Sequence, residues 1–228
     1  MTGAAEDDDY EAGPPSQRLA QIGEIVAARL TAAQGVQTIP VDGIEMFVRP
    51  DFLTVEECAR LIAMIDTDSQ PSSLFSEGAD NSFRTSHSCN LDRWDEEVEA
   101  IDIRVCELMG IDPSHGETLQ GQRYRMGQEF KPHHDFFHIN QSYWADMEAT
   151  GGQRSWTAMI YLNMPEAGGA TDFPMAGISV NPRSGLLLAW NNMGPNGAPN
   201  LRTLHAGAPV IAGTKYIVTK WFRERPWI

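Results

Sequence analysis

The second half of the chain, from residue 117 onward, constrains the fold most strongly because short apolar segments alternate there with turn residues. Each segment is rich in β-branched and aromatic residues, which favour strands, and Gly, Pro and Asn separate one segment from the next. The predicted strands are residues 119–126, 128–135, 155–163, 170–173, 176–180, 185–191, 203–210 and 214–223. About eight short strands with turns between them indicate a β-sandwich, a jelly roll or a closed barrel.

The first half has a different pattern, in which apolar residues recur at helical spacing. Three helices are predicted, and the residues that mark their starts and the end of the third are Ser16, Thr54 (with Glu57 completing a capping box), Asp92 and Gly110. A strand is predicted over residues 43–50 and a long loop over residues 68–90. Helices followed by strands favour an α+β fold over a βαβ sheet.

The chain is predicted to form one domain preceded by a tail. Residues 1–15 carry five acidic residues and no basic residue, and they end in Gly-Pro-Pro, so a disordered acidic tail is expected. Residues 16–228 are expected to form a single domain. Within it, residues 16–116 give helical support to a β-rich part over residues 117–228.

The charge and the termini exclude several classes of protein. The 17 basic and 31 acidic residues give a formal net charge of −14, and nucleic acid is not an expected partner because phosphate backbones bind through Lys and Arg. The acidic N-terminus does not resemble a secretory signal, and no apolar run is long enough to span a membrane. The three cysteines, Cys58, Cys89 and Cys106, form no C-x-x-C pair, so reduced thiols and a cytoplasmic location are expected.

Half of the six histidines lie within residues 133–138, where the sequence is HHDFFH. On a strand, His133 and Asp135 project from the same face, about 6–7 Å apart along the chain, whereas His134 faces away. This pair supplies two ligands of the 2-His-1-carboxylate arrangement of iron(II) oxygenases, and imidazole and carboxylate suit iron better than structural zinc. His205 lies inside a later predicted strand and is a candidate for the second histidine. An isolated H-x-D sequence is also common on ordinary polar surfaces.

Lys215 begins the last predicted strand, whose apolar residues alternate. A lysine at the start of a strand is most often a solvated end. A cation inside a barrel would instead need an anionic partner, and a bound carboxylate would provide one.

These residues together resemble the 2-oxoglutarate- and iron(II)-dependent dioxygenases, and in particular their prolyl 4-hydroxylase branch. The matching motifs occur in order between residues 84 and 223. They are Arg84-Thr-Ser, Tyr124-x-x-Gly-Gln-x-Phe130-x-x-His133-x-Asp135, Arg154-x-x-Thr-x-x-x-Tyr161, Gly168-Gly-x-Thr171, His205-Ala-Gly-x-Pro, and Gly213-x-Lys215 with Trp221. Each motif is weak alone, but the ordered set is specific.

The resemblance implies a double-stranded β-helix, or jelly roll, with supporting N-terminal helices, and it assigns roles to single residues. It makes His133, Asp135 and His205 the iron ligands, and it places Lys215 against the distal carboxylate of 2-oxoglutarate. The other residues implied for the co-substrate pocket are Tyr124, Tyr161, Thr171 and Trp221. Those implied on the substrate side are Arg84, Phe130 and Arg154, of which Arg154 is also counted with the catalytic residues.

The implied activity is an Fe(II)- and 2-oxoglutarate-dependent dioxygenase that consumes O₂, is supported by ascorbate, and releases succinate and CO₂. The expected substrate is a prolyl residue in a protein or peptide. The alternatives are the same chemistry on a free amino acid or other small molecule, and a non-catalytic module that binds metal or 2-oxoglutarate.

Several departures from the family pattern limit the assignment of a substrate. Phe130 stands where many members have tyrosine, and the polar segment 138–153 is expected to be a loop at the mouth of the site. The chain shows neither the secretory signal nor the additional domain of collagen-modifying relatives, so collagen is not the expected substrate. The acidic exterior favours a neutral or basic protein segment, and nothing in the sequence specifies an oligomeric state.

Overall fold

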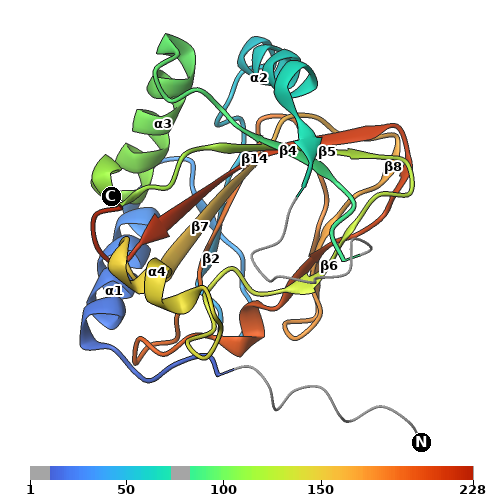
Figure 1. Ribbon diagram of the computed structural model, residues 1–228. Helices are drawn as coiled ribbons and strands as arrows, with labels where there is room; N and C mark the ends of the chain where they lie inside the picture. The colour runs from blue at the N-terminus through green and yellow to red at the C-terminus, as the bar shows by residue number, and fades with distance from the viewer. Residues whose placement is uncertain (1–10, 73–82, 228) are drawn as a thin grey trace, which may run out of the picture.

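The computed structural model describes residues 11–72 and 83–227 and combines four helices with two facing antiparallel sheets (Figure 1). The helices are α1 (Gln17–Ala32), α2 (Val55–Asp68), α3 (Glu96–Met109) and α4 (Trp144–Ala149), with short 3₁₀ turns at Pro113–His115 and Leu201–Thr203. No helix in the described part of the chain combines the length and apolar composition needed to cross a bilayer.

The larger sheet has eight strands in the order β1-β2-β11-β7-β14-β5-β4-β3. Their bounds are β1 (Gln37–Thr38), β2 (Met46–Arg49), β11 (Leu187–Asn191), β7 (Arg154–Tyr161), β14 (Thr214–Arg223), β5 (Gln120–Arg125), β4 (His87–Asn90) and β3 (Gln70–Pro71). All neighbouring strands are antiparallel. The longest strand, β14, lies near the centre and contacts both β7 and β5.

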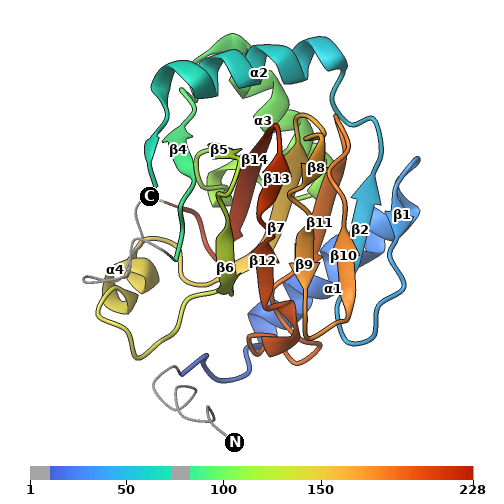
Figure 2. The ribbon, with the colours of Figure 1, turned by 90° about the vertical axis from the view of Figure 1, so that its right-hand side faces the viewer.

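The smaller sheet has the order β10-β9-β12-β6 and faces the larger one (Figure 2). Its strands are β10 (Ile178–Val180), β9 (Thr171–Phe173), β12 (His205–Gly207) and β6 (Phe130–His133), and a further pair joins β13 (Val210–Ala212) to β8 (Ala167–Gly168). Two antiparallel sheets packed face to face, with consecutive strands crossing between them, form a jelly roll. The predicted α+β jelly roll with N-terminal helices is therefore confirmed.

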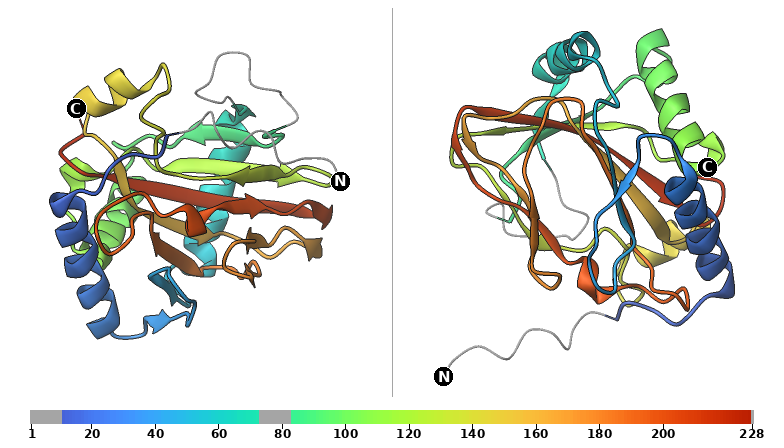
Figure 3. Two further views of the ribbon diagram at one scale, coloured as in Figure 1. Left: turned by 90° about the horizontal axis from the view of Figure 1, so that it is seen from below. Right: turned by 180° about the vertical axis from the view of Figure 1, so that it is seen from behind.

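Helices α1, α2 and α3 cover the outer face of the larger sheet (Figures 1 and 3). Successive residues of a strand point to opposite faces, so Trp156 and Ala158 of β7 pack toward the helices, whereas Met159 and Tyr161 pack between the sheets. Because both faces are covered, every residue of β7 is buried. The helices thus leave the inner face of the sheet to form the walls of a cavity.

The helix ends follow the local signals in the sequence. Ser16 caps α1, and the Thr54–Glu57 capping box forms at the start of α2. Gly110 ends α3 in the left-handed conformation that glycine adopts without strain. The third helix was predicted to begin at Asp92 but begins at Glu96, because the Asp95 carboxylate accepts the free backbone N–H groups there.

Three other predictions are corrected. Within the predicted loop 68–90, residues 87–90 form β4 because they pair with β5, and residues 73–82 lie outside the described residues. The predicted loop 138–153 contains α4. Residues 1–10 of the predicted tail also lie outside the described residues, but residues 11–15 contact the domain, since Ile139 N–H donates to the Glu11 carbonyl (2.8 Å).

The prediction of unpaired cysteines agrees with the structure. Cys58, Cys89 and Cys106 are all free thiols, two of them buried and Cys89 half-buried.

Candidate active site

His133, Asp135 and His205 come together between the two sheets, although His205 is far from the others in the sequence. His133 ends β6 and His205 begins β12, and these strands pair with the two histidines opposite each other. Asp135 follows two residues after the end of β6, so it lies just beyond the strand on which it was predicted. The ligand atoms of the three side chains all lie within 4.8 Å of one another.

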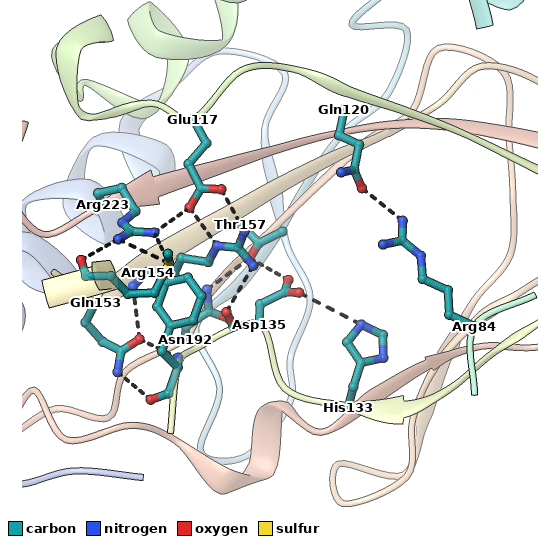
Figure 4. Close-up of polar contacts among 12 residues, drawn as sticks. Arg84, Glu117, Gln120, His133, Asp135, Gln153, Arg154, Thr157, Asn192 and Arg223 are labelled. Atoms are coloured by element: carbon teal, nitrogen blue, oxygen red, sulfur yellow. Dashed lines mark hydrogen bonds and ion pairs between the residues drawn. The ribbon is translucent and has the colours of Figure 1, made fainter. Parts of the chain in front are cut away.

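Hydrogen bonds fix the orientation of all three side chains. The Nδ1 atoms of His133 and His205 lie 2.8 Å and 2.9 Å from the backbone carbonyls of Lys131 and Thr203. A protonated Nδ1 leaves the Nε2 lone pair free. The Nε2 atoms of His133 and His205 lie 3.9 Å and 3.8 Å from the Asp135 carboxylate, and Figure 4 shows the His133 contact. Two lone pairs and one carboxylate therefore converge on one point.

A chain of two hydrogen bonds holds the Asp135 carboxylate in place. Thr157 donates its hydroxyl to Asp135 Oδ2 (2.8 Å), and Asn192 donates to the Thr157 hydroxyl (2.9 Å). Both supporting residues are fully buried. Such contacts hold a carboxylate ligand in place before any metal binds.

Burial and mutual charge set the protonation of His133 and Asp135. Burial, together with the neighbouring His205, holds the pKa of His133 well below its usual value, so the imidazole is neutral. Burial raises the pKa of Asp135, but His205, His133 and Arg154 outweigh this effect and the pKa is lowered. Neutral imidazoles and an ionised carboxylate are the forms that bind a divalent ion, and this donor set fits Fe(II).

On the inner side of the triad, a small cavity is lined by the residues predicted to hold the co-substrate. Tyr124, Thr171, Lys215 and Trp221 line it, together with His133, Asp135 and His205. The remaining predicted residue, Tyr161, is fully buried beside it and donates its hydroxyl to Thr171 Oγ1 (2.6 Å). The Tyr124 hydroxyl donates to Gln122 (2.7 Å) rather than to another residue of the predicted set.

Lys215 is the cation of this inner cavity. It is 2% exposed, and its Nζ lies 5.3 Å and 5.4 Å from the ring centres of Tyr124 and Tyr161. Among the ion pairs of the described residues, none involves Lys215, and burial lowers its pKa to about 7, although Asp172 acts in the opposite direction. The Trp221 Nε1 atom is also buried without a hydrogen-bond partner. These groups fit an anionic ligand such as 2-oxoglutarate.

On the outer side of the triad lies a larger cavity of about 380 Å³. One wall is Arg154, whose guanidinium lies between the rings of Phe137 (4.7 Å) and Trp221 (4.1 Å). Glu117 accepts two hydrogen bonds from Arg154 (2.7 and 2.6 Å) and one from Arg223 (3.0 Å). Burial raises the pKa of Glu117, but the two arginines outweigh it and keep the pKa low.

The opposite wall contains Arg84 and Phe130. Phe130 stacks on His133 with ring centres 3.5 Å apart, and the Arg84 guanidinium lies 4.8 Å from the centre of the Phe130 ring. Arg84 donates to Gln120 (2.9 Å) (Figure 4). The structure thus brings all three predicted substrate-side residues to the outer cavity, two on one wall and Arg154 on the other.

Sequence reasoning missed Glu117 and Arg223. Arg223 lies opposite Arg154 in the pairing of β14 with β7, and Glu117 precedes β5. Neither belongs to a local motif, so only the strand register could have indicated them. The other cluster histidines are not ligands: His134 Nε2 lies 3.0 Å from the Leu201 carbonyl, and His138 packs edge-on to Phe136.

A jelly roll that combines two histidines and one carboxylate with a buried lysine defines a class of protein, the 2-oxoglutarate- and Fe(II)-dependent oxygenases. The profile of the 2OG-Fe(II) oxygenase superfamily matches residues 119–223. The chain belongs to the prolyl 4-hydroxylase family of these enzymes.

Sequence relatives support this assignment. The chain is 34% identical over 200 residues to the probable prolyl 4-hydroxylase 8 of Arabidopsis thaliana. This match covers 77% of this chain and 67% of the plant protein. It is 37% identical over 144 residues to the prolyl 4-hydroxylase subunit alpha-1 of Gallus gallus, covering 63% of this chain and 28% of the subunit. The chain therefore spans about two thirds of the plant relative and about a quarter of the animal subunit.

Solved structures of prolyl hydroxylases have the same fold as this chain. The viral collagen prolyl hydroxylase of Paramecium bursaria chlorella virus-1, solved as a 2OG complex, matches with a TM-score of 0.60 and 27% identity over 84% of this chain and 97% of that chain. A Trichoplax adhaerens prolyl hydroxylase has the same fold, with a TM-score of 0.60 and 16% identity over 91% of each chain.

The enzyme is thus a 2-oxoglutarate-dependent dioxygenase that uses Fe(II), 2-oxoglutarate and O₂. When bound, iron, 2-oxoglutarate and O₂ would together supply the oxidising chemistry, with O₂ as the oxidant and succinate and CO₂ as the products of the co-substrate. The protein contributes orientation and shielding: the histidine–carbonyl bonds aim the metal ligands, and Lys215 is available to pair with a carboxylate. The rings of Phe130 and Trp221 form part of the wall of both cavities.

Proposed function

We propose that this enzyme hydroxylates a prolyl residue in a protein or peptide. The observation that carries the proposal is that two cavities share one wall. Phe130, His133, Asp135 and Trp221 line both the inner cavity, which contains Lys215, and the outer cavity, which contains Arg84 and Arg154. A co-substrate and a separate substrate can therefore reach the same metal from opposite sides.

The residues of the outer cavity support a prolyl substrate. Its lining includes the apolar rings of Phe83, Phe130, Trp221 and Trp227, which suit an apolar pyrrolidine ring. Its volume of about 380 Å³ accommodates a residue with its neighbours. The names of the relatives, prolyl 4-hydroxylases from plants and animals, agree with this substrate class. We propose His133, Asp135 and His205 as the iron ligands and Arg154 as the residue beside the prolyl ring.

The test is a product assay with a panel of substrates. The protein is incubated with Fe(II), 2-oxoglutarate and ascorbate, together with proline-containing peptides, a collagen-like peptide, free proline or other amino acids. We expect a peptide product heavier by one oxygen atom, formed in proportion to succinate. His133→Ala and Asp135→Ala should lower both products by more than about 100-fold because the metal is lost.

Two outcomes would contradict the proposal. Oxygen transfer to a free amino acid but to no peptide would assign the same chemistry to a small molecule. Metal binding without any 2-oxoglutarate turnover would indicate a non-catalytic module. An Arg183→Gln variant is the matched control, because Arg183 is an exposed arginine that pairs with Asp51 and lines neither cavity. The cytoplasmic location and the use of ascorbate stay predictions.

A further inference from the structure

Arg84 is a charged side chain of the outer cavity that the chemistry above leaves unused. It lines the cavity, and burial lowers its pKa, although Tyr124 and Asp135 act in the opposite direction. Its hydrogen-bond partners among the described residues are neutral: Nε donates to the Ser86 hydroxyl (3.2 Å) and a terminal nitrogen donates to the Gln120 amide oxygen (2.9 Å). An arginine keeps its charge under all ordinary conditions.

The most buried arginines among the described residues, Arg123, Arg154 and Arg223, have acidic partners. Arg154 and Arg223 share Glu117, and Arg123 pairs with Asp66 (2.7 Å). Within residues 11–72 and 83–227, no ion pair joins Arg84 to a carboxylate. Removing a guanidinium from water without an opposite charge is costly, so a ligand that brings a negative charge gains affinity there.

The position of this charge indicates which part of a ligand it meets. The Arg84 guanidinium lies over Phe130, and Phe130 stacks on the metal ligand His133. The charge is therefore separated from the triad by the thickness of one aromatic ring. Figure 4 shows Arg84 and Arg154 on opposite sides of Asp135. A prolyl ring that lies beside Arg154 and the triad leaves a neighbouring residue of the same peptide facing Arg84.

We propose that Arg84 is a specificity residue that pairs with an acidic side chain next to the target proline, so that the preferred substrate is an acidic proline-containing segment. This inference rests on the proposed function, because it assigns a flanking position of the same substrate. It reverses the expectation from the net charge of −14, which favoured a neutral or basic segment. The net charge of the protein affects how fast a charged peptide approaches it, whereas the guanidinium of Arg84 affects how tightly the bound peptide is held.

The test measures peptide binding and turnover separately. Host peptides with one proline carry Asp, Asn or Lys at the preceding or the following position, and fluorescence anisotropy gives their dissociation constants for the metal-loaded protein. We expect the Asp peptide to bind about 10-fold more tightly than the Asn peptide at one of the two positions, and the Lys peptide to bind most weakly. The same order should appear in kcat/KM, through KM rather than kcat.

Variants of Arg84 provide the decisive comparison. Arg84→Gln should bind the Asp and Asn peptides equally, Arg84→Lys should keep part of the preference, and Arg84→Glu should favour the Lys peptide. Arg183→Gln, which removes an exposed arginine away from both cavities, should keep the full preference. Equal binding of the three peptides by the unaltered protein, or an Asp preference that survives in Arg84→Gln, would overturn the proposal.

The two proposals fail in different ways. Binding that depends on Arg84 without hydroxylation of any peptide would contradict the proposed function and leave the specificity role supported. Hydroxylation of proline peptides with equal binding of the Asp, Asn and Lys forms would do the reverse.

Discussion

Lys215 and Arg154 are both buried cations beside the triad, but they belong to opposite sides of it and have opposite surroundings. Arg154 is held by two hydrogen bonds to Glu117, which raise its pKa against the effect of burial. Lys215 is in no ion pair among the described residues, and burial lowers its pKa to about 7. The charge of Arg154 is therefore part of the fold, whereas the charge of Lys215 destabilises the protein until an anion binds.

The largest expected effect is the loss of stability when Arg154 is replaced. Arg154→Met leaves Glu117 buried with one of its two arginines, and we expect the free energy of unfolding to fall by about 3 kcal/mol. Urea unfolding followed by circular dichroism measures this change. Replacing Glu117 as well, in Arg154→Met with Glu117→Leu, should restore part of the loss. The exposed pair is the control, since Arg183→Met should cost less than about 1 kcal/mol. Equal losses at both pairs would contradict the comparison.

On the Lys215 side, the same substitution should have the opposite effect on stability and a large effect on ligand binding. Lys215→Met removes an unpaired buried charge, so the melting temperature without ligand should rise. The affinity for 2-oxoglutarate should fall by about 100-fold, because a carboxylate of the ligand loses the lysine with which it would pair in the inner cavity. Titration calorimetry measures the affinity, and Lys215→Arg should retain more of it. A variant that binds 2-oxoglutarate as tightly as the unaltered protein would remove Lys215 from this role.

The smallest expected effect is a dependence of stability on pH. The pKa of Lys215 is about 7 in the folded protein and has an ordinary value of 10.5, so between these values the unfolded chain binds more protons. The free energy of unfolding of the metal-free protein should then rise with pH above about 7, by up to about 1.4 kcal/mol per pH unit relative to Lys215→Met. Below pH 7 both states are protonated and the difference is constant. Urea unfolding at pH 7, 8 and 9 measures it, and parallel curves for the two proteins would contradict it.

The features that could be predicted from the sequence are those that depend on a few neighbouring residues. The Ser16 cap, the Thr54 capping box and Gly110 act within one helical turn, so their positions follow from a few neighbouring residues. The spacing of His133 and Asp135 likewise follows from adjacent positions. His205 and Lys215 lie far from them in the sequence, and the resemblance to the family, rather than any periodicity, indicated their roles.

The unpredicted parts depend on which strands pair. Residues 87–90 are polar and look like a loop, yet they form β4 because β5 offers them backbone partners. Glu117 lies far from Arg154 and Arg223 in the sequence, and it meets them only because β14 pairs with β7 in one register. The contact of Glu117 with Arg154 and Arg223 therefore cannot be predicted from the sequence unless the register of the strands is known.

The pairing of β6 with β12 has a consequence for how the protein is made. His133 and His205 lie opposite each other on these strands but are separated by most of the β-rich half of the chain. A growing chain on the ribosome therefore has an incomplete set of metal ligands until β12 has emerged and closed against β6. Such long-range contacts form slowly. The complete ligand set forms only when β12 pairs with β6, so we expect the rate of metal uptake by refolding protein to report the closure of the smaller sheet.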